Sequence, residues 1–108
     1  MSRTRRLQAL WKELNDEHFE GALTPVPIRI TRSRRTYGYF HGPNNGGRAS
    51  IRISTVLADT SELLRETMIH EMIHQKLYER RISYWNEHGG KFQAEHVRIF
   101  GVPYEEPV

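Results

Sequence analysis

Hydrophobic side chains recur at helical spacing in three parts of the chain. These parts are residues 4–20, 63–78 and 91–100. In the first, Leu7, Trp11 and Leu14 form a single stripe, which predicts a helix with one buried face. In the second, apolar residues occur on most sides, as they do in helices at the centre of a domain. Asp59, three residues before Glu62, is the expected N-cap of this central helix.

Between the first two helices the hydrophobic period shortens to two residues, which is the repeat of a β-strand. Strands are predicted over residues 26–33, 36–41 and 48–54. The turn-forming sequence GPNNGG at 42–47 separates the last two, so we expect these two strands to pair as a hairpin. The order helix, three strands, helix, loop, helix indicates an α+β fold. No repeat or linker divides the chain, so residues 1–108 are expected to form a single domain.

Composition narrows the class of protein. The chain is 37% hydrophobic and 27% charged, as soluble globular proteins are, and no apolar run approaches the ~20 residues of a membrane span. We therefore expect no membrane partner and a cytoplasmic location, with association with the nucleoid as the alternative. Because the chain has no cysteine, a transition metal would need His, Asp or Glu ligands.

The central predicted helix carries the sequence HEMIH at residues 70–74, which matches the pattern H-E-x-x-H. One helical turn separates His70 from His74, so both imidazoles project from one side and can bind the same ion. Glu71 lies beside this pair, where it can reach a zinc-bound water without being a ligand. Zinc with three protein ligands acidifies its bound water, and a neighbouring carboxylate can accept the proton. The motif therefore predicts one Zn²⁺ per chain and Glu71 as the general base in peptide hydrolysis.

The spacing of the motif leaves the third metal ligand open. The downstream candidates are Glu87, His88, Glu95 and His96. His88 is favoured because Gly89 and Gly90 follow it, and glycines allow the backbone of a loop to approach closely. Glu95 is the main alternative. A glutamate as third ligand would make the chain a minimal gluzincin-like peptidase with no role on DNA.

HEMIH, followed fourteen residues later by HGGKF at 88–92, resembles the SprT-like metalloprotease domain of the Spartan-type DNA-dependent proteases. That family has the pattern HExxH, a loop and then HGxxF, and the resemblance covers about residues 7–100. It implies a small zincin-like domain, zinc bound by His70, His74 and His88, and Glu71 as the catalytic base. It also implies cleavage of proteins bound or crosslinked to DNA. A cysteine-containing zinc module often follows this domain in the family, and the sequence is expected to be a minimal version without it.

Charge is unevenly distributed along the chain. Residues 21–58 contain no Asp or Glu but six arginines. These are Arg29, Arg32, Arg34, Arg35, Arg48 and Arg52. Uncompensated arginines can bind phosphates, so we predict weak DNA binding without sequence preference. The alternative is that these arginines solubilise the sheet or pair with the acidic residues of the first helix.

Two further hypotheses concern the use of the site. The strand 48–54 is expected at an edge of the sheet, where an extended substrate segment can pair with it through backbone hydrogen bonds. Alternatively, the chain is a non-catalytic, zinc-stabilised module that binds nucleic acid. In such a module Glu71 would have no function.

Overall fold

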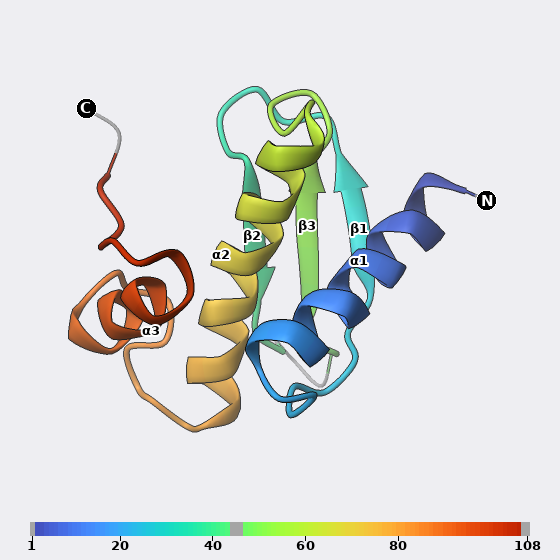
Figure 1. Ribbon diagram of the computed structural model, residues 1–108. Helices are drawn as coiled ribbons and strands as arrows, with labels where there is room; N and C mark the ends of the chain where they lie inside the picture. Colours follow the sequence, from blue (N-terminus) through green and yellow to red (C-terminus); the bar gives the residue numbers. More distant parts are fainter. Residues whose placement is uncertain (1, 44–46, 107–108) are drawn as a thin grey trace.

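The computed structural model describes residues 2–43 and 47–106, which form three helices and a three-stranded mixed sheet (Figure 1). The α+β fold predicted from the sequence is therefore confirmed. The elements in chain order are α1 (Arg3–His18), β1 (Ile28–Thr31), β2 (Gly38–His41), β3 (Ser50–Ser54), α2 (Ser61–Glu79) and α3 (Gly90–Phe100). Each predicted helix and strand is present, and the bounds differ from the prediction by a few residues at most.

The sheet has the strand order β1-β3-β2. β2 and β3 pair in antiparallel register, which confirms the hairpin, although residues 44–46 of its turn lie outside the described residues. β1 pairs with the other side of β3 in parallel register. The prediction that strand 48–54 lies at an edge of the sheet was therefore wrong. Both sides of β3 have a strand partner, and all its residues except Arg52 are buried.

Helices α1 and α2 lie on the same face of the sheet (Figure 1). The core lies between these two helices and the sheet. The strands contribute to it Ile28, Phe40, Ile51 and Ile53. The stripe on α1 is buried in this core, as its spacing predicted. At the contact of the two helices, the indole N–H of Trp11 donates to Oε1 of Gln75 at 3.2 Å. The opposite face of the sheet carries no helix in the described part of the chain.

The N-cap of α2 is Thr60, and the prediction of Asp59 was wrong by one residue. The Thr60 backbone is extended, and its hydroxyl accepts a hydrogen bond from the backbone N–H of Leu63 at 3.1 Å. This bond satisfies one of the free donors at the start of the helix. At the other end of the chain, Gly101 stops α3 with a left-handed backbone (φ 79°), and the following residues turn back beside α2. None of the described helices combines the length and the apolar character that a membrane span requires.

Candidate metal centre

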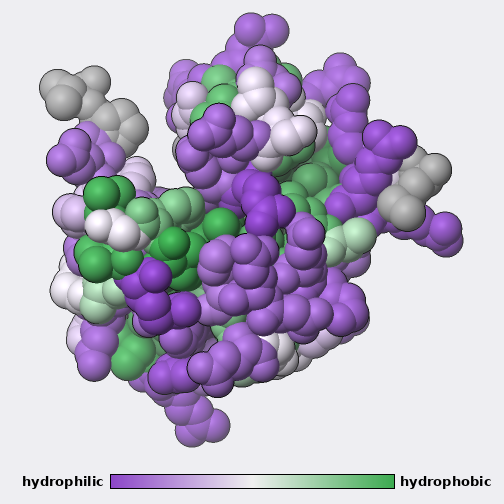
Figure 2. All heavy atoms as spheres, in the orientation of Figure 1, coloured by the Kyte–Doolittle hydropathy of each residue, from purple (hydrophilic) through white to green (hydrophobic). Residues whose placement is uncertain are grey.

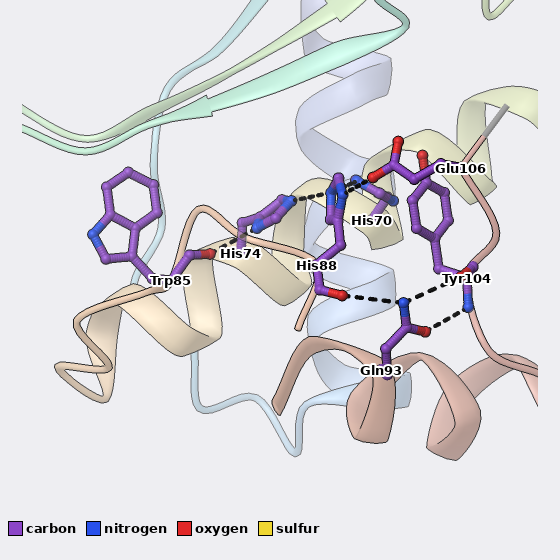
Figure 3. Close-up of polar contacts among 7 residues, drawn as sticks. All are labelled: His70, His74, Trp85, His88, Gln93, Tyr104 and Glu106. Atoms are coloured by element: carbon purple, nitrogen blue, oxygen red, sulfur yellow. Dashed lines mark hydrogen bonds and ion pairs between the residues drawn. The ribbon is translucent and has the colours of Figure 1, made fainter. Parts of the chain in front are cut away.

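Three imidazoles meet at one point beside the central helix (Figure 3). His70 and His74 project from the same face of α2, and His88 reaches them from the loop that precedes α3. The Nε2 atom of His88 lies 3.1 Å from Nε2 of His70 and 3.1 Å from Nε2 of His74. Ligand nitrogens bound at the usual Zn–N distance in a tetrahedral site are about 3.3 Å apart. The three side chains therefore fit a metal ion such as zinc.

Two of the three rings are held through their other nitrogen. Nδ1–H of His74 donates to the backbone carbonyl of Trp85 at 2.7 Å, and Nδ1–H of His88 donates to the carboxylate of Glu106 at 2.5 Å. A proton on Nδ1 leaves the lone pair of Nε2 free, and this is the tautomer that binds a metal through Nε2.

Burial keeps the imidazoles of α2 neutral. Burial, together with the smaller effect of the neighbouring rings of His74, His88 and His96, lowers the pKa of His70 to about 3. The pKa of His74 falls to about 4, again mainly through burial, against the opposing effect of the Trp85 carbonyl. Only the neutral ring offers a lone pair to a metal, so both side chains are ready to bind one at neutral pH.

Phe92 forms the apolar floor of the cluster. Its side chain is 1% exposed, and its ring centroid lies 4.8, 4.6 and 4.7 Å from those of His70, His74 and His88. An apolar surrounding lowers the local dielectric constant and so strengthens the interaction of the imidazoles with a cation.

Glu71 follows His70 on α2 and points toward β2. Its carboxylate accepts a hydrogen bond from the backbone N–H of Phe40, and the side chain is buried. Burial raises the pKa of Glu71 to about 8, although the Phe40 hydrogen bond opposes this shift. With His70 and His88, Glu71 borders two hollows, one of about 180 Å³ beside Trp85 and one of about 710 Å³ beside Tyr104.

The larger hollow is a groove between α2 and the residues that follow α3. Its walls come from the loop before β2, from the first half of α2, and from the end of α3 with the segment after it. Hydrophobic side chains gather over α3 and this last segment, and the groove opens beside them (Figure 2). An extended chain that enters this groove therefore passes Glu71.

Gly38 is a site residue that the sequence analysis missed, although a glycine within a strand often marks a close approach. A Cβ atom at Gly38 would lie 2.9 Å from Cγ2 of Thr67 and 3.2 Å from Cγ of Glu71. Only a glycine therefore lets β2 approach α2 at the level of Glu71.

Gly38→Ala is expected to lower the free energy of unfolding by about 1–3 kcal/mol, because the added methyl group overpacks this contact. The side chain of Glu71 must also move to make room for the methyl group. Chemical denaturation of the metal-loaded protein measures the loss of stability. Gly89→Ala is the matched control, since a Cβ at Gly89 contacts nothing within 4 Å. Equal stability of the two variants would contradict the close approach.

The structure places the alternative third ligand away from the cluster. The Glu95 carboxylate pairs with Nζ of Lys76 at 2.5 Å and with the guanidinium of Arg98 at 2.8 Å. His96 donates from Nδ1 to the carbonyl of Val102 at 2.6 Å. Among the described residues, the potential ligands that converge are His70, His74 and His88.

The six arginines of residues 21–58 are all exposed, and they come from two strands and from the segments between the strands. Arg29 of β1 is the register partner of Arg52 of β3, on the face of the sheet opposite the helices. Arg35 borders the groove beside Glu71. Within residues 2–43 and 47–106 none of the six forms an ion pair. The acidic residues of α1 pair elsewhere, Glu13 and Glu17 with Arg65 and Asp16 with Lys12.

Comparisons with known proteins agree with this geometry. The model of the SprT-like family matches residues 7–106. The human DNA-dependent metalloprotease SPRTN is 37% identical over 75 residues, which cover 67% of this chain. The aligned part is 15% of the length of the human protein, so the chain corresponds to a small portion of that relative. The family match spans the helix that carries His70 and His74, the loop that carries His88, and the sheet beside them, and the chain belongs to the SprT-like family.

Proposed function

We propose that the protein is a zinc-dependent endopeptidase. The observation that carries this proposal is the convergence of three imidazoles beside a buried carboxylate in a groove. His70, His74 and His88 would hold the ion. A zinc ion with three imidazole ligands acidifies water and polarises a peptide carbonyl.

Glu71 is assigned the role of general base. Its carboxylate can accept a proton from the attacking water and deliver it to the nitrogen of the leaving amine. A nearby cation favours the ionised form of a carboxyl group, which is the form that accepts a proton. The N–H of Phe40 holds this carboxylate in place, and burial in the groove excludes competing solvent.

An extended substrate segment is proposed to pair with β2. This strand lies at an edge of the sheet, and Gly38, Tyr39 and Phe40 border the hollow that contains Glu71. Pairing through backbone groups carries little information about side chains, so the sequence preference should be loose. The edge strand that serves the site is thus β2, and not the strand 48–54 expected from the sequence.

The test of this function is incubation of the zinc-loaded protein with unfolded proteins and with a basic DNA-binding protein. Single- or double-stranded DNA is added in separate reactions. We expect fragments, several cleavage sites per substrate, and none with Glu71→Gln. A protein that binds zinc but produces no fragments under any condition would contradict the peptidase proposal.

We further propose that the substrates are proteins associated with DNA. The DNA-dependent activity named for the human relative supports this, and so does the open face of the sheet. Register pairing places Arg29, Arg52 and Tyr39 in a row across three strands. Like charges on directly paired residues destabilise a sheet, so this row costs stability unless an anion lies on it.

Two aromatic rings stand beside the paired arginines. Tyr39 is 47% exposed, and its ring centroid lies 4.4 Å from that of His41. Burial and the charge of Arg52 lower the pKa of His41, so this ring is neutral at neutral pH. Guanidinium groups that bind phosphates, next to exposed rings that stack on bases, are typical of surfaces that bind single-stranded nucleic acid. The open face of the sheet therefore suits a single strand.

The double variant Arg29→Glu/Arg52→Glu is expected to weaken binding of single-stranded DNA at least 10-fold and to lower the salt slope by about 0.7 per lost contact. Fluorescence anisotropy at several salt concentrations measures both quantities. Arg5→Glu/Arg6→Glu on α1 is the matched control, with the same change of charge. A larger loss of DNA affinity in Arg34→Glu/Arg35→Glu would indicate that DNA binds to the loop before β2. An equal loss of affinity in the control would indicate that only the net charge of the protein matters.

A further inference from the structure

The segment after α3 is attached to the proposed metal centre by one glutamine. Oε1 of Gln93 accepts the backbone N–H of Tyr104 at 2.7 Å, and its amide N–H₂ donates to the Tyr104 carbonyl at 3.1 Å. The same nitrogen donates to the carbonyl of His88 at 3.2 Å. Gln93 thus joins the backbone of His88 to the chain eleven residues beyond Gln93 itself (Figure 3).

Tyr104 packs against two of the imidazoles. Its ring centroid lies 4.7 Å from that of His70 and 4.8 Å from that of His88. With Tyr104 in this position, the chain places Glu106 over His88, where its carboxylate accepts the proton of Nδ1 at 2.5 Å. His88 contacts Glu106 through Nδ1 and the other two imidazoles through Nε2 (Figure 3).

Apart from the rings of Phe92 and Tyr104 that pack against it, the His88 ring is held by its hydrogen bonds. His70 and His74 are one turn apart on a buried helix, and a carbonyl of the chain anchors His74. The loop of His88 continues with two glycines, and a Cβ at either of them would contact nothing within 4 Å. No side chain packs around these two glycines, so the hydrogen bond at Nδ1 contributes to the orientation of the ring.

We propose that Glu106 is a positioning residue of the metal centre, and that Gln93 sets its place. Glu106 keeps the proton of His88 on Nδ1 and directs Nε2 at the ion, in the manner of a carboxylate–histidine–metal triad. The inference rests on the proposed function, because it requires that His88 binds the metal. It gives the residues after α3 a role in the affinity for metal, in addition to their role as a wall of the groove.

Metal affinity is the quantity that tests this role. Loss of a carboxylate partner of a metal-bound histidine costs about 10–100-fold in affinity. We expect Glu106→Gln to bind Zn²⁺ about 10-fold more weakly in competition with a chromogenic chelator. The absorption spectrum of the Co²⁺-substituted protein should change as well, because the ligand field of the ion depends on the His88 ring. The melting temperature of the metal-free protein should not change, because the Glu106 side chain is 66% exposed.

The control is Glu105→Gln, which removes the same charge from the adjacent exposed position. Zinc affinity of Glu106→Gln equal to that of the parent would overturn the inference, as would an equal loss in Glu105→Gln, which would indicate a general effect of charge. A parent protein that binds no zinc would instead contradict the proposed function.

Gln93→Leu tests the attachment independently. This variant keeps Glu106 but removes the hydrogen bonds between Gln93 and the backbone of Tyr104 and His88, so we expect a similar loss of zinc affinity. The double variant Gln93→Leu/Glu106→Gln should lose no more than either single variant, because both act through the same hydrogen bond to His88. Additive losses would show that Gln93 acts separately and would remove it from the proposal.

Discussion

Glu71→Gln is expected to lower the rate of peptide hydrolysis by a factor of about 10²–10⁴, which is the usual contribution of a positioned general base. The amide has the same shape as the carboxylate, and its oxygen can still accept the N–H of Phe40. It cannot accept a proton at neutral pH, however. The measurement is kcat/KM on an unfolded protein substrate, together with zinc content and melting temperature.

Zinc content should stay at one ion per chain in this variant, because Glu71 is not among the converging ligand atoms. The matched control is Glu62→Gln, an exposed position in the first turn of the same helix, which should keep full activity. The alternative of a non-catalytic zinc-stabilised module makes the opposite prediction. Activity near that of the parent in Glu71→Gln would show that Glu71 is not the base.

His88→Ala is expected to reduce bound zinc from about one ion per chain to nearly none after dialysis. Two imidazoles remain, but the third ligand and its link to Glu106 are lost. A ligand present at 100 times its dissociation constant stabilises the folded state by about 2.7 kcal/mol. In a domain of about 100 residues that corresponds to a fall in melting temperature of roughly 10–20 °C relative to the zinc-loaded parent. Elemental analysis and calorimetry measure the two effects.

Glu95→Gln is the informative comparison for this prediction. Glu95 was the alternative ligand from the sequence, but its carboxylate pairs with Lys76 and Arg98. The variant should therefore keep its zinc and lose only the stability of these ion pairs. Normal zinc content in His88→Ala combined with loss of zinc in Glu95→Gln would reverse the assignment and favour the gluzincin-like alternative.

Much of the fold could be predicted from the sequence, because apolar side chains repeat every few residues along helices and strands. The apolar stripe of α1 and the mostly buried α2 follow from a repeat of 3.6 residues, and the hairpin follows from alternation on both sides of a turn. The position of His70 next to His74 could also be predicted from the sequence, because one helical turn places both side chains on one face. Thr60 shows the limit of this reasoning. Asp59 and Thr60 are both good caps, and the backbone conformation selects between them.

Contacts between segments far apart in the sequence decided the order of the strands in the sheet. The pairing of β1 with β3 puts β3 in the centre of the sheet and makes β2 the edge strand beside Glu71. It also aligns Arg29 with Arg52.

The sequence by itself determined the helices, the strands and the HEMIH pair, because each depends on residues a few positions apart. Only the tertiary structure decided which strand borders Glu71, why Gly38 must be a glycine, and how Gln93, Tyr104 and Glu106 close over His88. Hydrophobic periodicity carries no information on which strands become neighbours or where an irregular segment docks. Those outcomes depend on the packing of the whole core and on individual hydrogen bonds across it.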